Sequence, residues 1–170
     1  MVAAARSEIP VSGIIPISRL RGEDEHETAL LCEMAARAAD YLKAFSWCGS
    51  ITDSYFGGGV GKVFAIFFFR IQPASADVDE WLWVAVGEVP SAYIIVQECP
   101  TPLAAFDMYI WGMQRWVGLA REGRTSADVP EINVPPTPEW AAELDSRLEF
   151  LITMIRPVFV EQAQLGLRTA

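Results

Sequence analysis

The longest uninterrupted apolar run in the chain is Val63–Phe69, with four phenylalanines in seven residues. A strand with one wet face alternates apolar and polar side chains, whereas a strand covered on both faces is apolar throughout. A membrane-spanning helix needs about 20 apolar residues, so this run is far too short to be one. The run therefore predicts a central, buried strand within Lys62–Gln72.

Three further strands are expected around this one, because short apolar or alternating segments bounded by turn residues are typical of strands. The glycine run Gly57–Gly61 predicts a turn before the central strand, and Gly87–Ser91 predicts a turn further along. All connections are short, which favours an antiparallel meander. The additional strands are expected at Ser50–Phe56, Glu80–Val86 and Ala92–Gln97.

Helices are expected before and after the strand region. Acidic residues within Glu23–Glu27 suit the positive N-terminal end of a helix that runs to about Ser46. Thr101–Pro102 and Thr137–Pro138 each pair a capping hydroxyl with a proline at the first helical position, and they predict the starts of two more helices. Pro157 is expected to kink or end the last helix.

This order of elements predicts an α+β fold. The expected architecture is an N-terminal helix, a four-stranded, mainly antiparallel meander sheet, and two C-terminal helices packed on one face. We expect all the helices to share that face. Residues 22–165 should form a single domain and residues 1–21 an irregular N-terminal arm, since 170 residues suit one domain.

The formal net charge of −9 narrows the choice of partner. Nucleic acids and anionic membrane surfaces repel such a chain, so neither is expected as a partner. A basic protein is the partner that this charge attracts, although acidity also serves solubility alone. The sequence does not decide whether the protein forms a homo-oligomer.

The chain has three cysteines, Cys32, Cys48 and Cys99, at wide spacings and without a C-x-x-C pair. An odd, scattered set argues against a disulfide framework and against a zinc site. Reduced thiols in the cytoplasm fit best, and no cofactor or metal is expected. Cys32 lies on the expected apolar side of the first helix and is predicted to be buried.

Known catalytic patterns do not fit the sequence. The glycine run superficially resembles a phosphate loop, but Phe56 stands where that loop needs its first glycine, and Val63 follows Lys62 where a hydroxyl must hold magnesium. The single histidine, His26, lies at an expected helix start and is poorly placed to move a proton. The sequence therefore predicts a non-catalytic protein.

Carboxylates occur near one another at Asp77, Asp79 and Glu80, and again at Glu88 and Glu98. Paired carboxylates act as acid and base only where burial moves their pKa values apart. Nothing in the sequence indicates such burial, so solvated loop charges are the favoured interpretation.

The tryptophans divide into two groups. Trp111 lies off the apolar stripe of its helix, near Asp107, and is the aromatic side chain most expected to be exposed. Exposed tryptophans are enriched where proteins bind one another. The tryptophans expected in the core are Trp81, Trp83, Trp116 and Trp140.

A pattern of residues runs through the middle of the chain, over about Phe45–Leu151. It resembles a group of small bacterial proteins that are similar in style to the immunity proteins encoded beside polymorphic toxins. The resemblance implies toxin neutralisation and brings no catalytic residues with it. The segments that carry it are Glu80–Val84, Val86–Pro90, Ala92–Tyr93, Asp107–Tyr109, Met113, Trp116–Val117 and Asn133–Trp140.

Two functions from different classes follow. The first is an acidic binding protein that occludes a basic toxin or effector enzyme by means of complementary charge and aromatic anchors. The second is an enzyme or small-ligand protein with a pocket between sheet and helices, using Tyr55, Tyr93, Tyr109 and Glu88. For the first, the expected contact residues are Glu88, Glu98, Asp107 and Trp111, with Asp77, Asp79 and Glu80 as further candidates.

Overall fold

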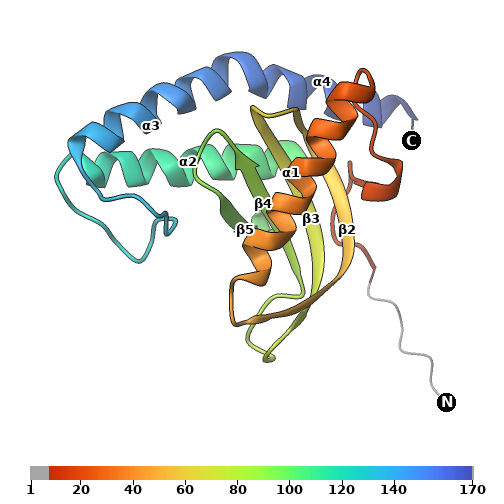
Figure 1. The fold of residues 1–170 in the computed structure, drawn as a ribbon, viewed down its shortest axis with the longest axis horizontal. Helices are drawn as coiled ribbons and strands as arrows, with labels where there is room; N and C mark the ends of the chain where they lie inside the picture. The colour runs from red at the N-terminus through yellow and green to blue at the C-terminus, as the bar shows by residue number, and fades with distance from the viewer. Residues whose placement is uncertain (1–7, 170) are drawn as a thin grey trace.

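The computed structural model describes residues 8–169, with side chains up to residue 165. Its centre is one antiparallel sheet whose five strands follow chain order, so each strand pairs with the next (Figure 1). This confirms the α+β class, the meander and the four expected strands, to which the N-terminal arm adds a fifth. The strands are β1 (Ile15–Pro16), β2 (Cys48–Val60), β3 (Phe64–Pro73), β4 (Trp81–Gly87) and β5 (Ala92–Ile95).

The helices begin where the sequence predicts. Asp24, Thr101 and Thr137 each accept a backbone N–H hydrogen bond from the residue three positions later, over 2.7, 3.2 and 3.3 Å. The last helix does not end near Pro157, because its hydrogen bonding changes to a π-helical turn at Leu151–Ile155 and then becomes α-helical again. The helices are α1 (Glu25–Lys43), α2 (Pro102–Ala120), α3 (Pro138–Phe150) and α4 (Arg156–Thr169).

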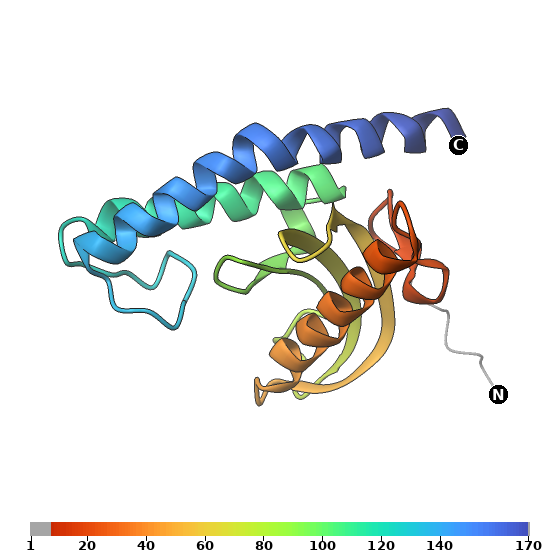
Figure 2. The ribbon, with the colours of Figure 1, turned by 45° about the horizontal axis from the view of Figure 1, so that its top comes forward.

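The sheet is covered on both faces, so the expectation that all helices share one face is wrong. Strand β3 shows why, because neighbouring side chains of a strand point to opposite faces. Phe64, Ile66 and Phe68 belong to the core under α2, α3 and α4, whereas Phe67 and Phe69 belong to the core under α1. Figures 1 and 2 show α1 crossing one face and the C-terminal helices lying over the other. Because phenylalanine side chains project from both faces of β3, helices must pack on both faces of the sheet to bury them.

The glycine run is not the turn that the sequence predicts. Gly57, Gly58 and Gly59 are buried within β2, and the turn follows them at residues 61–63. A Cβ on Gly58 would lie 2.9 Å from a ring carbon of Phe159, so the missing side chain lets α4 pack against the strand backbone. Gly59 has a φ of 151°, a conformation that other residues rarely adopt. We call the buried stretch Gly57–Gly59, on which α4 packs at Gly58, the glycine seam.

Strand β2 is irregular along its length. Its pairing with β3 shifts register between Cys48 and Ser50, between Ile51 and Asp53, and again beside Gly58.

The N-terminal arm is less irregular than expected. Ile15 and Pro16 pair with Phe56 and Tyr55 of β2, and Leu20 is fully buried against the α1 side of the sheet. The described part of the arm therefore belongs to the domain. Within the described residues, no helix combines the length and apolar character needed to cross a bilayer.

Candidate groove at the β5 edge

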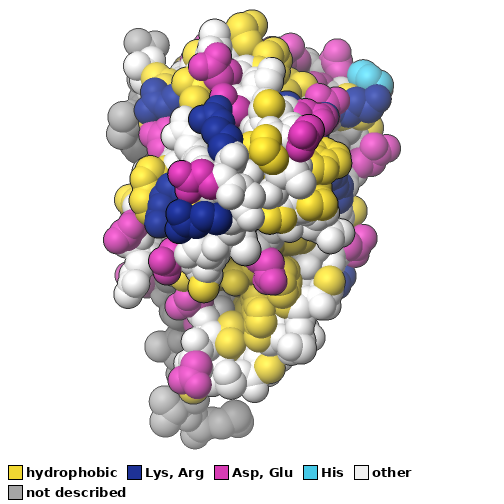
Figure 3. All heavy atoms as spheres, turned by 90° about the vertical axis from the view of Figure 1, so that its left-hand side faces the viewer, with side chains coloured by type: hydrophobic (Ala, Val, Ile, Leu, Met, Phe, Trp, Pro, Cys, Tyr) yellow, Lys and Arg dark blue, Asp and Glu magenta, His cyan; other side chains and the backbone are white. Residues whose placement is uncertain are grey.

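Two adjoining hollows open beside β5, the last strand of the sheet. The first, of about 810 Å³, lies among α1, the β4–β5 turn, α3 and residues 131–134. The second, of about 550 Å³, lies among β5, α2 and residues 127–131. Tyr41, Phe45 and Glu131 line both, so the hollows form one continuous depression, which we call the β5-edge groove. Figure 3 faces this end of the molecule and shows hydrophobic side chains gathered in a recess, with acidic side chains beside it.

An aromatic cluster forms the α1 side of the groove. The ring of Phe45 lies 5.2 Å from Tyr41, 4.8 Å from Trp47 and 5.5 Å from Tyr93, measured between centroids. Burial is the main cause that raises the pKa of Tyr41 to about 12, with Tyr93 contributing a smaller effect. These contacts hold the C-terminal end of α1 against the free edge of the sheet.

Tyr109 fixes the opposite wall. It rises from α2 and is 2% exposed, and its hydroxyl donates a 2.7 Å hydrogen bond to the carbonyl oxygen of Pro90 in the β4–β5 turn. Burial raises the pKa of Tyr109 well above its usual range. The hydroxyl is thus a neutral structural donor that ties the turn to α2.

Large apolar side chains remain exposed at the second hollow. Tyr93 is 41% exposed, Ile95 is 51% exposed and Trp111 is 54% exposed, and all three line it. The exposure of Trp111 confirms the sequence-based prediction. Trp140, in contrast, was expected in the core and is 43% exposed beside the first hollow. The burial of Trp83 and Trp116 is confirmed, and Trp81 is half-buried.

The charges of the two hollows differ. Glu98, Asp128 and Glu131 line the second, and no lysine or arginine among the described residues lines it. The first is mixed, because Arg37 and Arg147 lie there among carboxylates. Arg147 donates to the carbonyl oxygen of Glu88 and pairs with Glu143 at 2.8 Å. The lining of the second hollow is therefore the more acidic of the two.

The structure brings only some of the predicted contact residues together. Glu98 and Trp111 line the second hollow, and Glu88 lines the first. Asp107 is one turn from Trp111 on α2, but Arg156 holds its carboxylate through two hydrogen bonds of 2.8 and 3.0 Å. Sequence reasoning missed Tyr41, Ile95, Asp128 and Glu131, whose positions in the groove depend on segments far apart in the chain.

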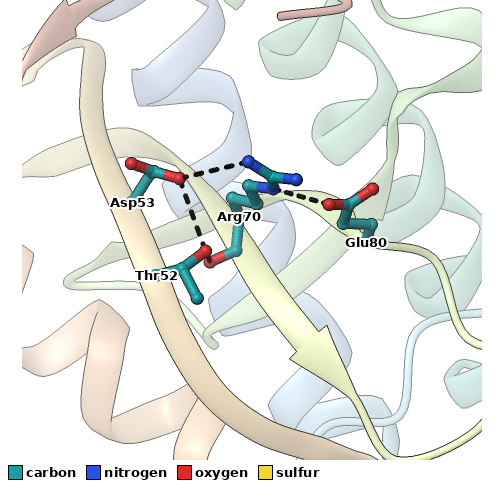
Figure 4. A network of polar contacts seen from close by, with 4 residues as sticks. All are labelled: Thr52, Asp53, Arg70 and Glu80. Carbon is teal, nitrogen blue, oxygen red and sulfur yellow. Dashed lines mark hydrogen bonds and ion pairs between the residues drawn. The ribbon is translucent and has the colours of Figure 1, made fainter. Parts of the chain in front are cut away.

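The other acidic candidates lie outside the groove. Asp77 and Asp79 are exposed in the β3–β4 loop and line neither hollow. Glu80 pairs with Arg70 at 2.5 Å, and Arg70 also lies 3.9 Å from Asp53 (Figure 4). The guanidinium carbon of Arg70 is 5.4 Å from the ring centroid of Trp81. Glu80 is thus already paired with an arginine of the same chain, at the surface of the sheet.

The groove gathers only some of the tyrosines that the sequence offers for a ligand or proton-transfer site. Of the three candidate tyrosines, Tyr93 and Tyr109 line the second hollow, whereas Tyr55 contacts Phe68 and Trp81 instead. The pKa shifts of Tyr41 and Tyr109 run upward, away from neutrality, which opposes proton transfer.

The described residues include no group of three or more His, Cys, Asp or Glu side chains that could hold a metal ion. Cys32 is exposed on α1, so the expectation that it is buried is wrong. Cys48 and Cys99 are buried, and burial raises the pKa of both thiols.

The chain was compared with known protein families, curated proteins and solved structures. None of them matches it. The candidate site therefore depends on geometry and charge alone.

Proposed function

We propose that this protein is a non-catalytic binding protein that covers a basic protein partner, such as a toxin or effector enzyme, in the manner of an immunity protein. The observation that carries the proposal is the second hollow, where Trp111 and Ile95 are more than half exposed in a lining that contains three carboxylates. Exposed aromatic anchors supply affinity at protein interfaces, and complementary charge supplies orientation and speed of association.

The proposal explains two further features. Tyr109 and the Tyr41–Phe45 cluster hold the groove in one shape, so little ordering is needed on binding. The net charge of −9 attracts a basic partner from a distance.

Site-directed photo-crosslinking tests this proposal. A benzophenone amino acid replaces Trp111 in one protein and Asp79 in a matched control, since Asp79 is exposed but outside the groove. We expect a basic protein to be crosslinked from position 111 and not from position 79, and its toxic or enzymatic activity to be suppressed by the wild-type chain in a 1:1 ratio. Equal crosslinking from both positions, or a captured partner whose activity is unaffected, contradicts the proposal.

The second candidate function is a small-ligand protein, and the volume of the first hollow, about 810 Å³, favours it. Its lining includes Arg37, Asn133 and Trp140 as possible ligand contacts. Native mass spectrometry of the protein purified from its own cells distinguishes the two functions. A stoichiometric metabolite that is lost in Trp140→Ala would favour the ligand protein.

A further inference from the structure

We propose that the second hollow receives an arginine side chain of the partner, with its guanidinium stacked on Trp111 and facing the surrounding carboxylates. This inference rests on the proposed function and names the group that the β5-edge groove recognises. It depends on the combination of an apolar hollow, an exposed indole and a charge that no cation of the lining balances.

The surroundings of Trp111 already show that its ring binds a guanidinium. The Cζ atom of Arg115, one turn along α2, lies 4.8 Å from the ring centroid. Its Nη1 atom donates a 3.3 Å hydrogen bond to the carbonyl oxygen of Asp128 in the facing segment. Trp111 nevertheless stays 54% exposed, so part of its surface remains open to a second group.

The same protein contains a completed example of such a site. Arg70 pairs with Glu80 and Asp53 (Figure 4). It also lies over the ring of Trp81, so one indole and two carboxylates hold one guanidinium. The second hollow has the indole and three carboxylates, those of Glu98, Asp128 and Glu131, without an arginine or lysine in its lining. Arg115 lies on the indole from outside this lining, so the partner's guanidinium would stack on the part of Trp111 that stays exposed.

Arginine fits the hollow better than lysine for a physical reason. The guanidinium is planar, stacks on aromatic faces and is weakly hydrated, whereas an ammonium group is compact and strongly hydrated. The floor of the hollow is apolar, with Ile94 and Val129 buried there, so an entering cation loses water. That loss costs arginine less than lysine.

Titration with synthetic peptides tests the inference directly. Two blocked octapeptides of alternating sequence, one of arginine and alanine and one of lysine and alanine, are added to the full-length protein. The indole N–H signals are followed by NMR, with the Trp111 signal assigned through Trp111→Phe. We expect the arginine peptide to shift the Trp111 signal and to bind about threefold more tightly than the lysine peptide, the size of an exposed cation–π contact.

Matched double variants separate the hollow from overall charge. We expect Glu98→Gln with Glu131→Gln to weaken arginine-peptide binding about fivefold, as exposed ion pairs allow. The control, Asp77→Asn with Asp79→Asn, removes the same charge outside the groove and should leave binding unchanged. Equal losses in both double variants, equal affinity for the two peptides, or a shift at Trp140 in place of Trp111 overturns the inference.

These failures are distinguishable from failure of the proposed function. A basic partner crosslinked from position 111, with no preference for the arginine peptide, keeps the protein-binding function and removes only the arginine site. Absence of any partner at position 111 removes the function itself.

Discussion

The β2 region and the β5 edge of the sheet differ in how much apolar surface they leave exposed. At the glycine seam, the missing side chain of Gly58 lets α4 pack directly on β2, and Phe159 is 2% exposed there. At the β5 edge, Tyr93, Ile95 and Trp111 carry large side chains that nothing in the described chain covers fully. Apolar surface is therefore buried where glycine permits a helix to approach the sheet closely. It stays exposed where bulky side chains lie beside several carboxylates. Stability should therefore depend on the seam, and binding on the edge.

The largest effect is expected from Phe159→Ala, which removes the ring that α4 places on the seam. The ring centroid of Phe159 lies 4.9 Å from that of Phe106 and 6.1 Å from that of Phe64, so its loss leaves a cavity in the core. We expect the free energy of unfolding to fall by about 4 kcal/mol. Urea denaturation followed by circular dichroism measures this, and a loss no larger than that of a surface substitution would break the comparison.

The next effect is expected from Gly59→Ala. The new Cβ would lie 2.5 Å from the carbonyl oxygen of Phe64, and the backbone has a positive φ of 151°. We expect a loss of about 3 kcal/mol from clash and strain. Gly118→Ala is the matched control, because a Cβ there meets nothing within 4 Å on a helix, and alanine should stabilise it by about 0.5–1 kcal/mol. Opposite signs in thermal melting are the expected result.

Tyr109→Phe tests what keeps the edge groove in shape. Removing the hydroxyl leaves the carbonyl oxygen of Pro90 without this donor, and we expect a loss of about 1 kcal/mol near pH 7. A smaller change combined with an unaltered peptide affinity would show that the turn holds its position without this bond.

The same variant carries a pH prediction. Burial raises the pKa of Tyr109 in the folded state, so this stabilisation is fully present below about pH 10 and is lost as the pH rises further. Each pH unit above 10 should lower the stability of the wild type by about 1.4 kcal/mol more than that of Tyr109→Phe. Urea unfolding of both proteins at pH 8 and pH 11 measures the difference. An equal loss of unfolding free energy in the two proteins between these pH values would contradict the prediction.

The smallest stability effect is expected from Trp111→Ala. The side chain is 54% exposed, so we expect the free energy of unfolding to change by less than about 0.5 kcal/mol. The affinity for the arginine peptide should nevertheless fall to that of the lysine peptide. Together these results would sharpen the contrast, because a residue nearly neutral for folding would contribute measurably to binding.

Much of the architecture follows from local signals. The apolar run that became β3 and the capping residues Asp24, Thr101 and Thr137 act over a few residues, and the structure confirms them. The exposure of Trp111 was also predictable, because it depends on helical spacing alone.

Features that depend on distant segments were not predictable in the same way. Glycine favours a turn and a tight packing contact equally. At Gly58 the packing of Phe159, from the far C-terminal part of the chain, decides between them. Asp107 is neutralised by Arg156, which is 49 residues away. The apolar spacing of Trp140 on α3 does not reveal that the opposite wall of the first hollow stands too far away to cover it.

The irregular half of β2 has a consequence for behaviour at high concentration. Within the described residues, β1 covers only Tyr55 and Phe56, so the stretch from Cys48 to Ser54 has a strand neighbour on its β3 side alone. A regular edge of that length is a template on which a second molecule adds a strand and begins a fibril. The two register shifts in this stretch disrupt the even ladder that such growth requires. We therefore expect the bulges to disfavour aggregation by strand addition at this edge.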